Sequence, residues 1–395
     1  MKKIEQKDLF ELKNVGQPVV AGDAFFFTET KMNEKKNTYE TAIYKYTADG
    51  NVAYGDEGTV NSSLKVSPDG KWISFISNAG EEKTPQLKIQ SVQGGKAIAL
   101  TEEKKGVSSY VWAKDSQSIV FQTTKPEEEE KKEEFPQPII VEKTTYRFDG
   151  GTFLPNDEIT QIKKVDVATK EGTTLFESKE SIGLRDVLHN GTTLVVDRDL
   201  SNVRWTLDSA EACYVDVTTG DIHPILEAGT DESYRYVLDA KDGAVLQYSS
   251  GEHGFVTQAD LIVNFDSTPT AEGHILNLTS GLDVEWGDWL VADFQQAVTG
   301  VAPQWFDEES FLACASVLYR LYLDGRVEKI FDELLHLTGA TIISEDELFI
   351  TYSTTTVPSV LARLNLTTGE ITDLYNPNEA YLVEHIVTTP ERFTY

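Results

Sequence analysis

The sequence predicts an all-β protein: a seven-bladed β-propeller of four-stranded antiparallel blades, with a short N-terminal helix. Two observations carry this prediction. Short apolar runs bounded by turn residues, such as residues 72–76 and 193–196, are typical of strands. Two kinds of turn also alternate along the whole chain, and a repeat of about 40 to 50 residues selects a propeller over a sandwich or a barrel. The 395 residues are therefore expected to form one repeat domain.

Helical periodicity is confined to the start of the chain. Ile4, Leu9, Phe10 and Leu12 are spaced so that they share one face of a short helix. We therefore expect a helical segment within residues 1–16 and strands after it.

The first kind of turn precedes a hydrophobic strand. In residues 67–70, proline and glycine occupy the second and fourth positions, as a type I turn favours. The seven turns of this kind are residues 22–23, 67–70, 114–117, 189–191, 241–243, 307–309 and 345–347.

The second kind of turn follows an alternating strand and closes on a glycine. The seven glycines are Gly50, Gly94, Gly172, Gly220, Gly273, Gly325 and Gly369. The two series interleave strictly, as an up-and-down unit of four strands requires, so seven blades follow.

One repeat is longer than the others. The excess lies in the third, where residues 125–158 form an insertion between two strands of one blade. Its charge run, residues 125–134, indicates a solvated loop. Residues 144–151 alternate aromatic with polar side chains and end on an Asp-Gly turn signal, so this part is expected to be ordered.

Composition excludes several classes of function. Asp and Glu number 65 against 35 Lys and Arg, a formal net charge of −30. Nucleic acids and anionic membranes are therefore not expected partners, because both attract clustered Lys and Arg. The two cysteines, Cys213 and Cys314, fit a reducing compartment. With no leader-like start and no membrane-length apolar run, a cytoplasmic location is expected.

The sequence carries no recognisable catalytic, metal or cofactor motif. It lacks a Gly-x-Ser-x-Gly elbow, and its six histidines have no ligand spacing. Residues 248–254 contain Ser, Glu and His, but we interpret them as a loop. Residues 197–199 and 239–243 have too few oxygen ligands for calcium and are interpreted as strand ends and turns. No catalytic residue, metal or cofactor is predicted.

The tryptophans are interpreted mainly as core. Trp72, Trp112 and Trp305 flank turns of the first kind, where side chains pack blade against blade. Trp286 and Trp289 lie in an acidic stretch, and their role stays open.

Four motifs together resemble a known family. They are residues 7–12 with 15–18, residues 66–72, residues 146–150 and residues 390–395. In this order they resemble the N-terminal propeller of the prolyl oligopeptidase family of serine peptidases, and its acylaminoacyl-peptidase branch in particular. The resemblance covers essentially the whole chain.

The resemblance implies a role without catalysis in this chain. In such a family the catalytic triad belongs to a separate C-terminal α/β-hydrolase domain. That domain and short peptide substrates are then the implied partners, and residues 386–395 are the start of the linker to it. The implied role is gating, in which the propeller admits short peptides and excludes folded proteins.

The candidate residues for a substrate channel or a domain interface are Tyr146, Arg147, Asp149, Pro390 and Phe393. Arg and Tyr are common anchors at buried contacts. An Arg147–Asp149 pair that stabilises a hairpin is an equally good interpretation. The acidic residues 307–309 are compared with the paired glutamates of the dipeptidyl-peptidase branch, but their place on a repeat turn favours a structural role.

Two alternative functions stay open at this point. One is a free-standing propeller that serves as a scaffold for a protein partner. The other is a metal-dependent propeller enzyme, such as a lactonase, with acidic residues converging on its axis. The sequence leaves open whether the chain is a fragment or a complete protein, and also its substrate specificity, oligomeric state and entry route.

Overall fold

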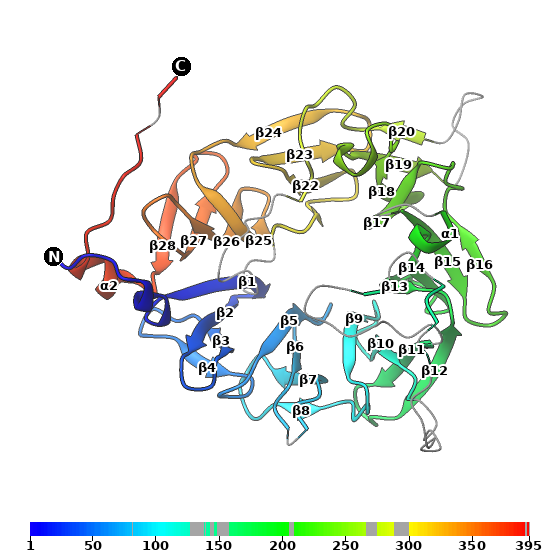
Figure 1. Ribbon diagram of the computed structural model, residues 1–395, viewed down its shortest axis with the longest axis horizontal. Coiled ribbons are helices and arrows are strands. Elements are labelled where there is room, and N and C mark those ends of the chain that lie inside the picture. The colour runs from blue at the N-terminus through cyan, green and yellow to red at the C-terminus, as the bar shows by residue number, and fades with distance from the viewer. Residues whose placement is uncertain are drawn as a thin grey trace. The chain divides into compact units, whose positions relative to one another are not determined.

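The described strands form seven sheets, each made of four strands that follow one another in the chain and pair antiparallel (Figure 1). The computed structural model describes residues 1–80, 82–126, 138, 140–142, 146–147, 158–204, 209–265, 275–287, 300–391 and 393–394. The chain is thus a seven-bladed β-propeller, and the predicted fold class is confirmed.

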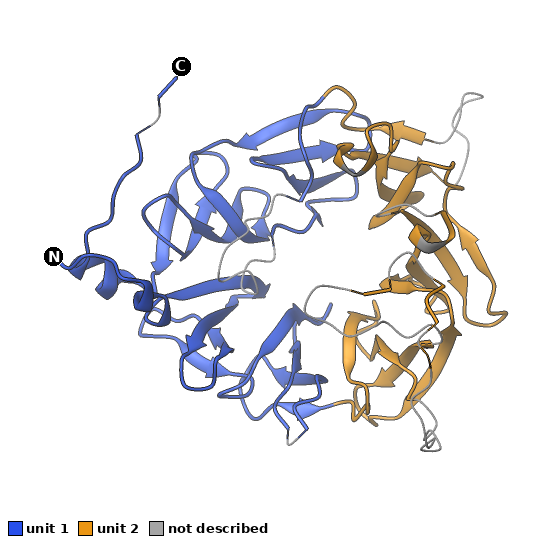
Figure 2. Ribbon diagram, viewed as in Figure 1, with its two compact units in different colours: residues 1–99, 282–395 blue, residues 100–281 orange. Residues whose placement is uncertain are grey.

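The chain divides into two compact units (Figure 2). Unit 1 comprises residues 1–99 and 282–395 and holds four blades. Its strands are β1 (Lys13–Ala21), β2 (Ala24–Asn33), β3 (Thr38–Lys45) and β4 (Val52–Tyr54); β5 (Asn61–Val66), β6 (Trp72–Ser77), β7 (Gln86–Ser91) and β8 (Ile98–Ala99); β21 (Gln304–Trp305), β22 (Ser310–Cys314), β23 (Leu318–Tyr322) and β24 (Val327–Phe331); and β25 (His336–Ser344), β26 (Glu347–Ser353), β27 (Val360–Asn365) and β28 (Ile371–Tyr375).

Unit 2 comprises residues 100–281 and holds three blades. Its strands are β9 (Val107–Trp112), β10 (Ser118–Thr124), β11 (Thr160–Asp166) and β12 (Gly172–Ser178); β13 (Ile182–Val187), β14 (Thr193–Asp199), β15 (Ala210–Asp216) and β16 (Ile222–Pro224); and β17 (Ser233–Ala240), β18 (Gly243–Ser249), β19 (Asp260–Phe265) and β20 (Ile275–Asn277). The expected insertion, residues 125–158, falls between β10 and β11, and most of it lies outside the described residues.

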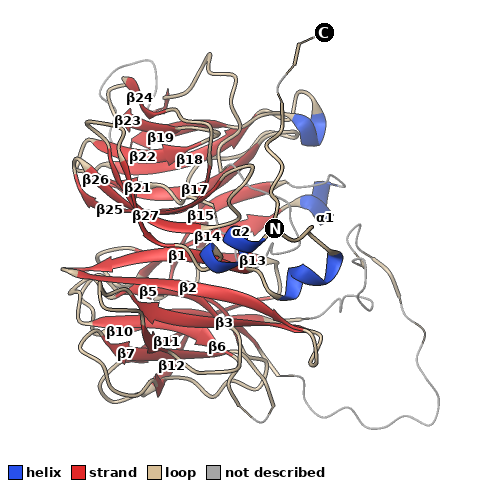
Figure 3. Ribbon diagram, turned by 90° about the vertical axis from the view of Figure 1, so that its left-hand side faces the viewer, coloured by secondary structure: helices blue, strands red, loops and turns tan. Residues whose placement is uncertain are grey.

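Helices are short in the described part of the chain (Figure 3). They are the 3-10 helices η1 (Gln6–Phe10) and η2 (Gly254–Val256) and the α-helices α1 (Ser201–Arg204) and α2 (Glu379–Glu384). None of these helices is long and apolar enough to cross a membrane.

The predicted turns fall where a four-stranded blade needs them. The turns of the first kind join the first strand of a blade to the second, as at residues 67–70 between β5 and β6. Five glycines of the second kind lie between the third and fourth strands, Gly172 is the first residue of the fourth strand β12, and Gly273 is outside the described residues. The strand order predicted from the turns is confirmed.

Neighbouring blades pack face to face, and this packing explains why their second strands are continuous apolar runs. Phe26 of β2 is fully buried in a cluster with Ile73 and Phe75 of β6. Phe27, its neighbour on the opposite face of β2, is fully buried with Phe349 of β26. A strand covered on both faces has no solvent side, so its residues form a continuous apolar run.

The start of the chain is less helical than residues 1–16 suggested. Only residues 6–10 form η1, and β1 already begins at Lys13. The backbone N–H of Lys13 donates to Oδ1 of Asn378 at 2.9 Å, and that of Val15 donates to Oγ of Ser359 at 2.9 Å. These contacts with the last blade hold the segment extended, since tertiary hydrogen bonds outweigh weak helical propensity.

Two of the tryptophan interpretations can be followed in the structure. Trp112 is buried, and Trp305 packs edge-on against Phe311 at a centroid distance of 5.3 Å. Trp286, whose role was open, is also buried and packs edge-on against Tyr319 at 5.4 Å. Trp289 lies outside the described residues.

Candidate functional site

Of the candidate residues singled out from the sequence, Tyr146, Arg147, Pro390 and Phe393 are among the described residues. Tyr146 is about half exposed, and Asp149 lies outside the described residues, so its pairing with Arg147 stays a prediction. Pro390 and Phe393 follow α2 and are both exposed. Their roles stay predictions.

The acidic turn over residues 307–309 has a structural role. The Asp307 carboxylate accepts hydrogen bonds from the backbone N–H groups of Glu309 and Ser310, both at 2.8 Å. Its Oδ2 also accepts a hydrogen bond from Nη2 of Arg320 at 2.6 Å. Its oxygens hold the β21–β22 turn together, which favours the structural interpretation of this acidic motif.

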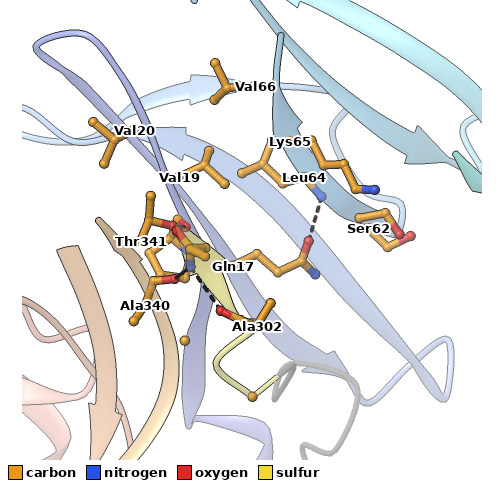
Figure 4. A pocket seen from close by; sticks show the side chains of 15 residues that line it. Gln17, Val19, Val20, Ser62, Leu64, Lys65, Val66, Ala302, Ala340 and Thr341 are labelled. Atoms are coloured by element: carbon orange, nitrogen blue, oxygen red, sulfur yellow. Dashed lines mark hydrogen bonds between the residues drawn. The ribbon is translucent and has the colours of Figure 1, made fainter. Parts of the chain in front are cut away.

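A cavity of about 650 Å³ lies in unit 1, among the first strands of its four blades (Figure 4). We call it the first-strand pocket. The described residues that line it are Gln17, Pro18, Val19, Val20, Ser62, Ser63, Leu64, Lys65, Val66, Gly300, Ala302, Gln304, Gly339, Ala340 and Thr341. They come from β1, β5 and β25 and from β21 with the residues before it. Its volume is within the usual range of small-ligand sites.

Two strained residues shape the pocket. Gln17 has a φ of 45° and Ser63 a φ of 56°, a left-handed conformation that side chains other than glycine rarely adopt. Among the six such non-glycine residues in the described chain, these two lie inside strands. Each lies in a β-bulge, where the pairing of β1 with β2 or of β5 with β6 shifts register. Backbone strain that a fold maintains often marks a functional site.

Side-chain amides fix the walls of the pocket. The Oε1 atom of Gln17 accepts the backbone N–H of Leu64 at 2.7 Å, which links β1 to β5 (Figure 4). Gln304 links β21 to β25, since its Nε2 donates to the carbonyl of Ala340 at 2.8 Å and its Oε1 accepts from the N–H of Ile342 at 3.3 Å. The pocket is therefore preformed by hydrogen bonds between blades.

A further contact closes the wall between β1 and β25. The Oγ1 atom of Thr341 donates to the carbonyl of Pro18 at 2.5 Å. Gly339 faces the same proline, and a Cβ atom placed there would lie 2.6 Å from Pro18 Cδ. Only glycine allows the two strands to approach this closely.

The described lining of the first-strand pocket is mostly apolar and uncharged. Lys65 is the single charged residue among the described lining residues, although the whole chain carries 65 acidic side chains. Ser62 and Ser63 add two hydroxyl groups to this lining. The described residues also contain no group of three side chains suited to hold a metal ion.

Sequence reasoning missed this pocket for a physical reason. The resemblance included residues 15–18, but nothing in the sequence indicated that Gln17 has a left-handed backbone. The pocket joins segments from both ends of unit 1, and only the three-dimensional arrangement of four blades brings them together. A Gln-Pro pair within a strand is the one available signal, because proline in a strand marks a bulge or an edge.

Fold and site together define a seven-bladed propeller with a ligand-sized pocket among its first strands. No family model matches the chain. A curated protein, "Uncharacterized peptidase YuxL" of Bacillus subtilis (strain 168), is 24% identical over 413 aligned residues. The alignment takes in 100% of this chain and 62% of that peptidase, so the chain spans less than two thirds of its curated relative.

Solved structures show the same fold. The acylaminoacyl peptidase of Pyrococcus horikoshii matches with a TM-score of 0.70 at 18% identity, over 97% of this chain and 56% of that one. The β-propeller domain of the Trilobed protease from Pyrococcus furiosus matches with a TM-score of 0.62 at 15% identity, over 93% and 99%. The resemblance to peptidase propellers stated from the sequence is thus confirmed at the level of fold.

Proposed function

We propose that this chain is the non-catalytic, substrate-gating propeller of a cytoplasmic serine peptidase that hydrolyses short peptides. The catalytic α/β-hydrolase domain then belongs to a part of the parent protein outside this sequence, and residues 386–395 lead toward it. One observation carries the proposal: the whole chain aligns with a peptidase but takes in only 62% of it. The acylaminoacyl peptidase structure, of which this chain matches 56%, supports the same division.

The structure is consistent with a role in substrate selection. Side-chain hydrogen bonds link neighbouring blades of unit 1 around the first-strand pocket. A propeller made of rigid blades restricts access by size, so short extended peptides pass more easily than folded proteins. Selection by a rigid fold is consistent with inter-blade hydrogen bonds such as Gln17–Leu64.

The test compares this chain with its full-length parent. Both are treated with a fluorophosphonate probe, which labels activated serines, and both are assayed on a short fluorogenic peptide and on a folded protein. We expect the chain alone to be unlabelled and inactive, and the parent to cleave the peptide but not the folded protein. Turnover by the chain alone would contradict its non-catalytic role. Cleavage of the folded protein by the parent would contradict gating.

A further inference from the structure

The first residues of the chain pair with residues 384–386 in unit 1. The backbone N–H of Lys2 donates to the carbonyl of Glu384 at 2.7 Å, and the N–H of Ile386 donates to the carbonyl of Lys2 at 2.9 Å. Lys2 and His385 thereby form a parallel β-bridge, which places the N-terminus beside α2 (Figures 1 and 3). We call residues 1–10 and 379–386 together the terminal clip.

The terminal clip is fixed to the propeller on its inner side. Asp8 and His385 are both buried. The hydroxyl group of Tyr381 donates to Oδ2 of Asp8 at 3.0 Å, and the Tyr381 ring stacks on that of His385 at a centroid distance of 3.9 Å. Directly before α2, the amide of Asn378 accepts the N–H of Lys13 at 2.9 Å and donates to its carbonyl at 2.8 Å. These contacts hold the clip in one orientation.

The outer side of the terminal clip is apolar. His385 has an extended backbone and is buried, so the side chain of the next residue, Ile386, points away from the propeller. A third of the exposed large hydrophobic residues in the described chain, five of fifteen, belong to the clip: Met1 (82% exposed), Ile4 (55%), Phe10 (41%), Val383 (72%) and Ile386 (49%). Exposed apolar side chains gathered in this way mark an interaction site.

The charges beside these apolar residues are paired with one another. Nζ of Lys2 lies 2.6 Å from the Glu384 carboxylate, and Nζ of Lys7 lies 2.9 Å from that of Glu5. The four side chains sum to zero charge, so a partner that covers them buries no lone charge among them. An anionic membrane is attracted by an excess of Lys and Arg, which these pairs do not supply. The surface therefore suits another protein surface.

The segment that follows the clip indicates which protein surface this is. Residues 387–395 continue directly from Ile386, and when fully extended they reach at most roughly 30 Å. A domain joined by such a short connection stays near the clip at a high effective concentration, so a modest apolar contact is sufficient for docking. The proposed function provides that domain, because it places the catalytic α/β-hydrolase domain beyond these residues.

We propose that the terminal clip is the docking surface for the catalytic domain, with Met1, Ile4, Val383 and Ile386 in the contact. The inference rests on the proposed function for the identity of the partner. Its new element is the part played by the first residues of the chain, which are far from the linker in sequence. The catalytic domain then rests on residues from both ends of the propeller, and its orientation does not depend on the linker alone.

The test measures whether the clip is covered in the full-length parent. Val383→Cys is made both in the 395-residue chain and in the parent, and its alkylation by iodoacetamide is followed by mass spectrometry of the peptide that contains residue 383. The two native cysteines of the chain are buried and do not compete. We expect alkylation to be about tenfold slower in the parent, because only the undocked fraction reacts. Ile4→Cys, in the other half of the clip, should show the same protection.

Val52→Cys is the matched control. Val52 is 49% exposed, as Ile386 is, and it begins β4 in the first blade. Because β1, β2 and β3 pair antiparallel, the turn before β4 lies at the end of the blade opposite to the clip. We expect the thiol at this position to be alkylated at the same rate in the chain and in the parent.

Two results would overturn the proposal. One is equal alkylation of Val383→Cys in the two proteins. The other is protection in the chain alone that grows with its concentration, because a second copy would then occupy the clip. Hydrogen exchange of the unsubstituted proteins provides a measurement without variants, and residues 379–386 should exchange more slowly in the parent than in the chain.

The outcomes separate this inference from the proposed function. A parent that cleaves short peptides but leaves Val383→Cys as reactive as in the chain would contradict docking alone. A parent that protects this position but has no peptidase activity would contradict the proposed function and leave the docking surface intact.

Discussion

The side-chain amide of Gln122 pairs with the edge of the neighbouring blade at Leu184. Its Oε1 accepts the backbone N–H of Leu184 at 2.8 Å, and its Nε2 donates to the carbonyl of Ile182 at 3.2 Å. The first strand of a blade has a partner strand on one side only, so its other edge presents unpaired backbone groups. The glutamine satisfies two of these groups as a neighbouring strand would.

Similar contacts recur between other consecutive blades within each unit. In unit 1, Gln304 pairs with Ala340 and Ile342 of β25. In unit 2, the Asp197 carboxylate of β14 accepts the backbone N–H of Tyr236 in β17 at 2.9 Å. Each strand reached in this way contains a β-bulge, where regular pairing is interrupted. Side-chain hydrogen bonds therefore satisfy the blade edges where strand pairing cannot.

Replacing Gln122 with leucine is expected to destabilise the fold. The variant keeps the approximate size of the side chain but leaves the N–H of Leu184 and the carbonyl of Ile182 without their partner. An unsatisfied buried polar group costs about 1–3 kcal/mol, and urea unfolding measures the loss. The control is Gln93→Leu, at an exposed turn position. Equal unfolding midpoints for the two variants would show that the Gln122 contact contributes nothing.

The blade pattern was predictable because its causes are local. The run over residues 25–27 and the turn over residues 67–70 each indicate strand or turn from a few neighbouring residues. The contacts between blades were not predictable in this way. Gln122 and Leu184 are 62 positions apart, and Val15 and Ser359 are 344 apart. The first-strand pocket depends on such distant contacts, so it became visible only in the assembled blades.

Replacing Gly339 with alanine is expected to strain the contact between β1 and β25. The added Cβ would lie 2.6 Å from Pro18 Cδ and 2.9 Å from Thr351 Oγ1, closer than such atoms approach. Overpacking of this kind costs about 1–3 kcal/mol, and thermal or urea unfolding measures it.

Two variants serve to interpret the Gly339 result. Gly183→Ala is the matched control, because its Cβ would meet nothing within 4 Å. Pro18→Ala added to Gly339→Ala removes the nearer of the two clashes, so the double variant should recover part of the lost stability. A Gly339→Ala variant as stable as Gly183→Ala would contradict the close approach of the two strands.

Cys213 is expected to be chemically inert in the folded protein. Its side chain is fully buried, and this burial raises the pKa of the thiol to about 12. The thiolate, which is the reactive form, is therefore scarce at neutral pH. Cys314 is buried as well. Mass spectrometry after iodoacetamide treatment should find neither cysteine modified in buffer and both modified in denaturing urea. Rapid alkylation of Cys213 in the native protein would contradict its burial.

Asp8 joins the two ends of the chain. Its Oδ2 accepts the backbone N–H of Glu5 at 2.8 Å and the hydroxyl group of Tyr381 in α2 at 3.0 Å. His385 follows α2, and its Nε2 lies 3.9 Å from the same oxygen. The hydrogen bond from Glu5, followed by that from Tyr381 and the charge of His385, lowers the pKa of the Asp8 carboxyl group below its usual value of 3.8.

The lowered pKa gives the sign of a pH effect on stability. The folded state holds Asp8 ionised more strongly than the unfolded state does, so the stabilisation is complete above the usual pKa of 3.8 and is lost as the pH falls through the folded value. Asp8→Asn keeps the shape but not the charge. We therefore expect Asp8→Asn to lower the thermal unfolding midpoint at pH 7, about three units above the usual pKa. Toward pH 3, about one unit below it, the difference in midpoint between the variant and wild type should narrow, because wild-type Asp8 becomes protonated as well. Asp23→Asn, at an exposed turn, should show no such convergence. A gap that stays constant or widens in acid would refute a stabilising role for the ionised Asp8.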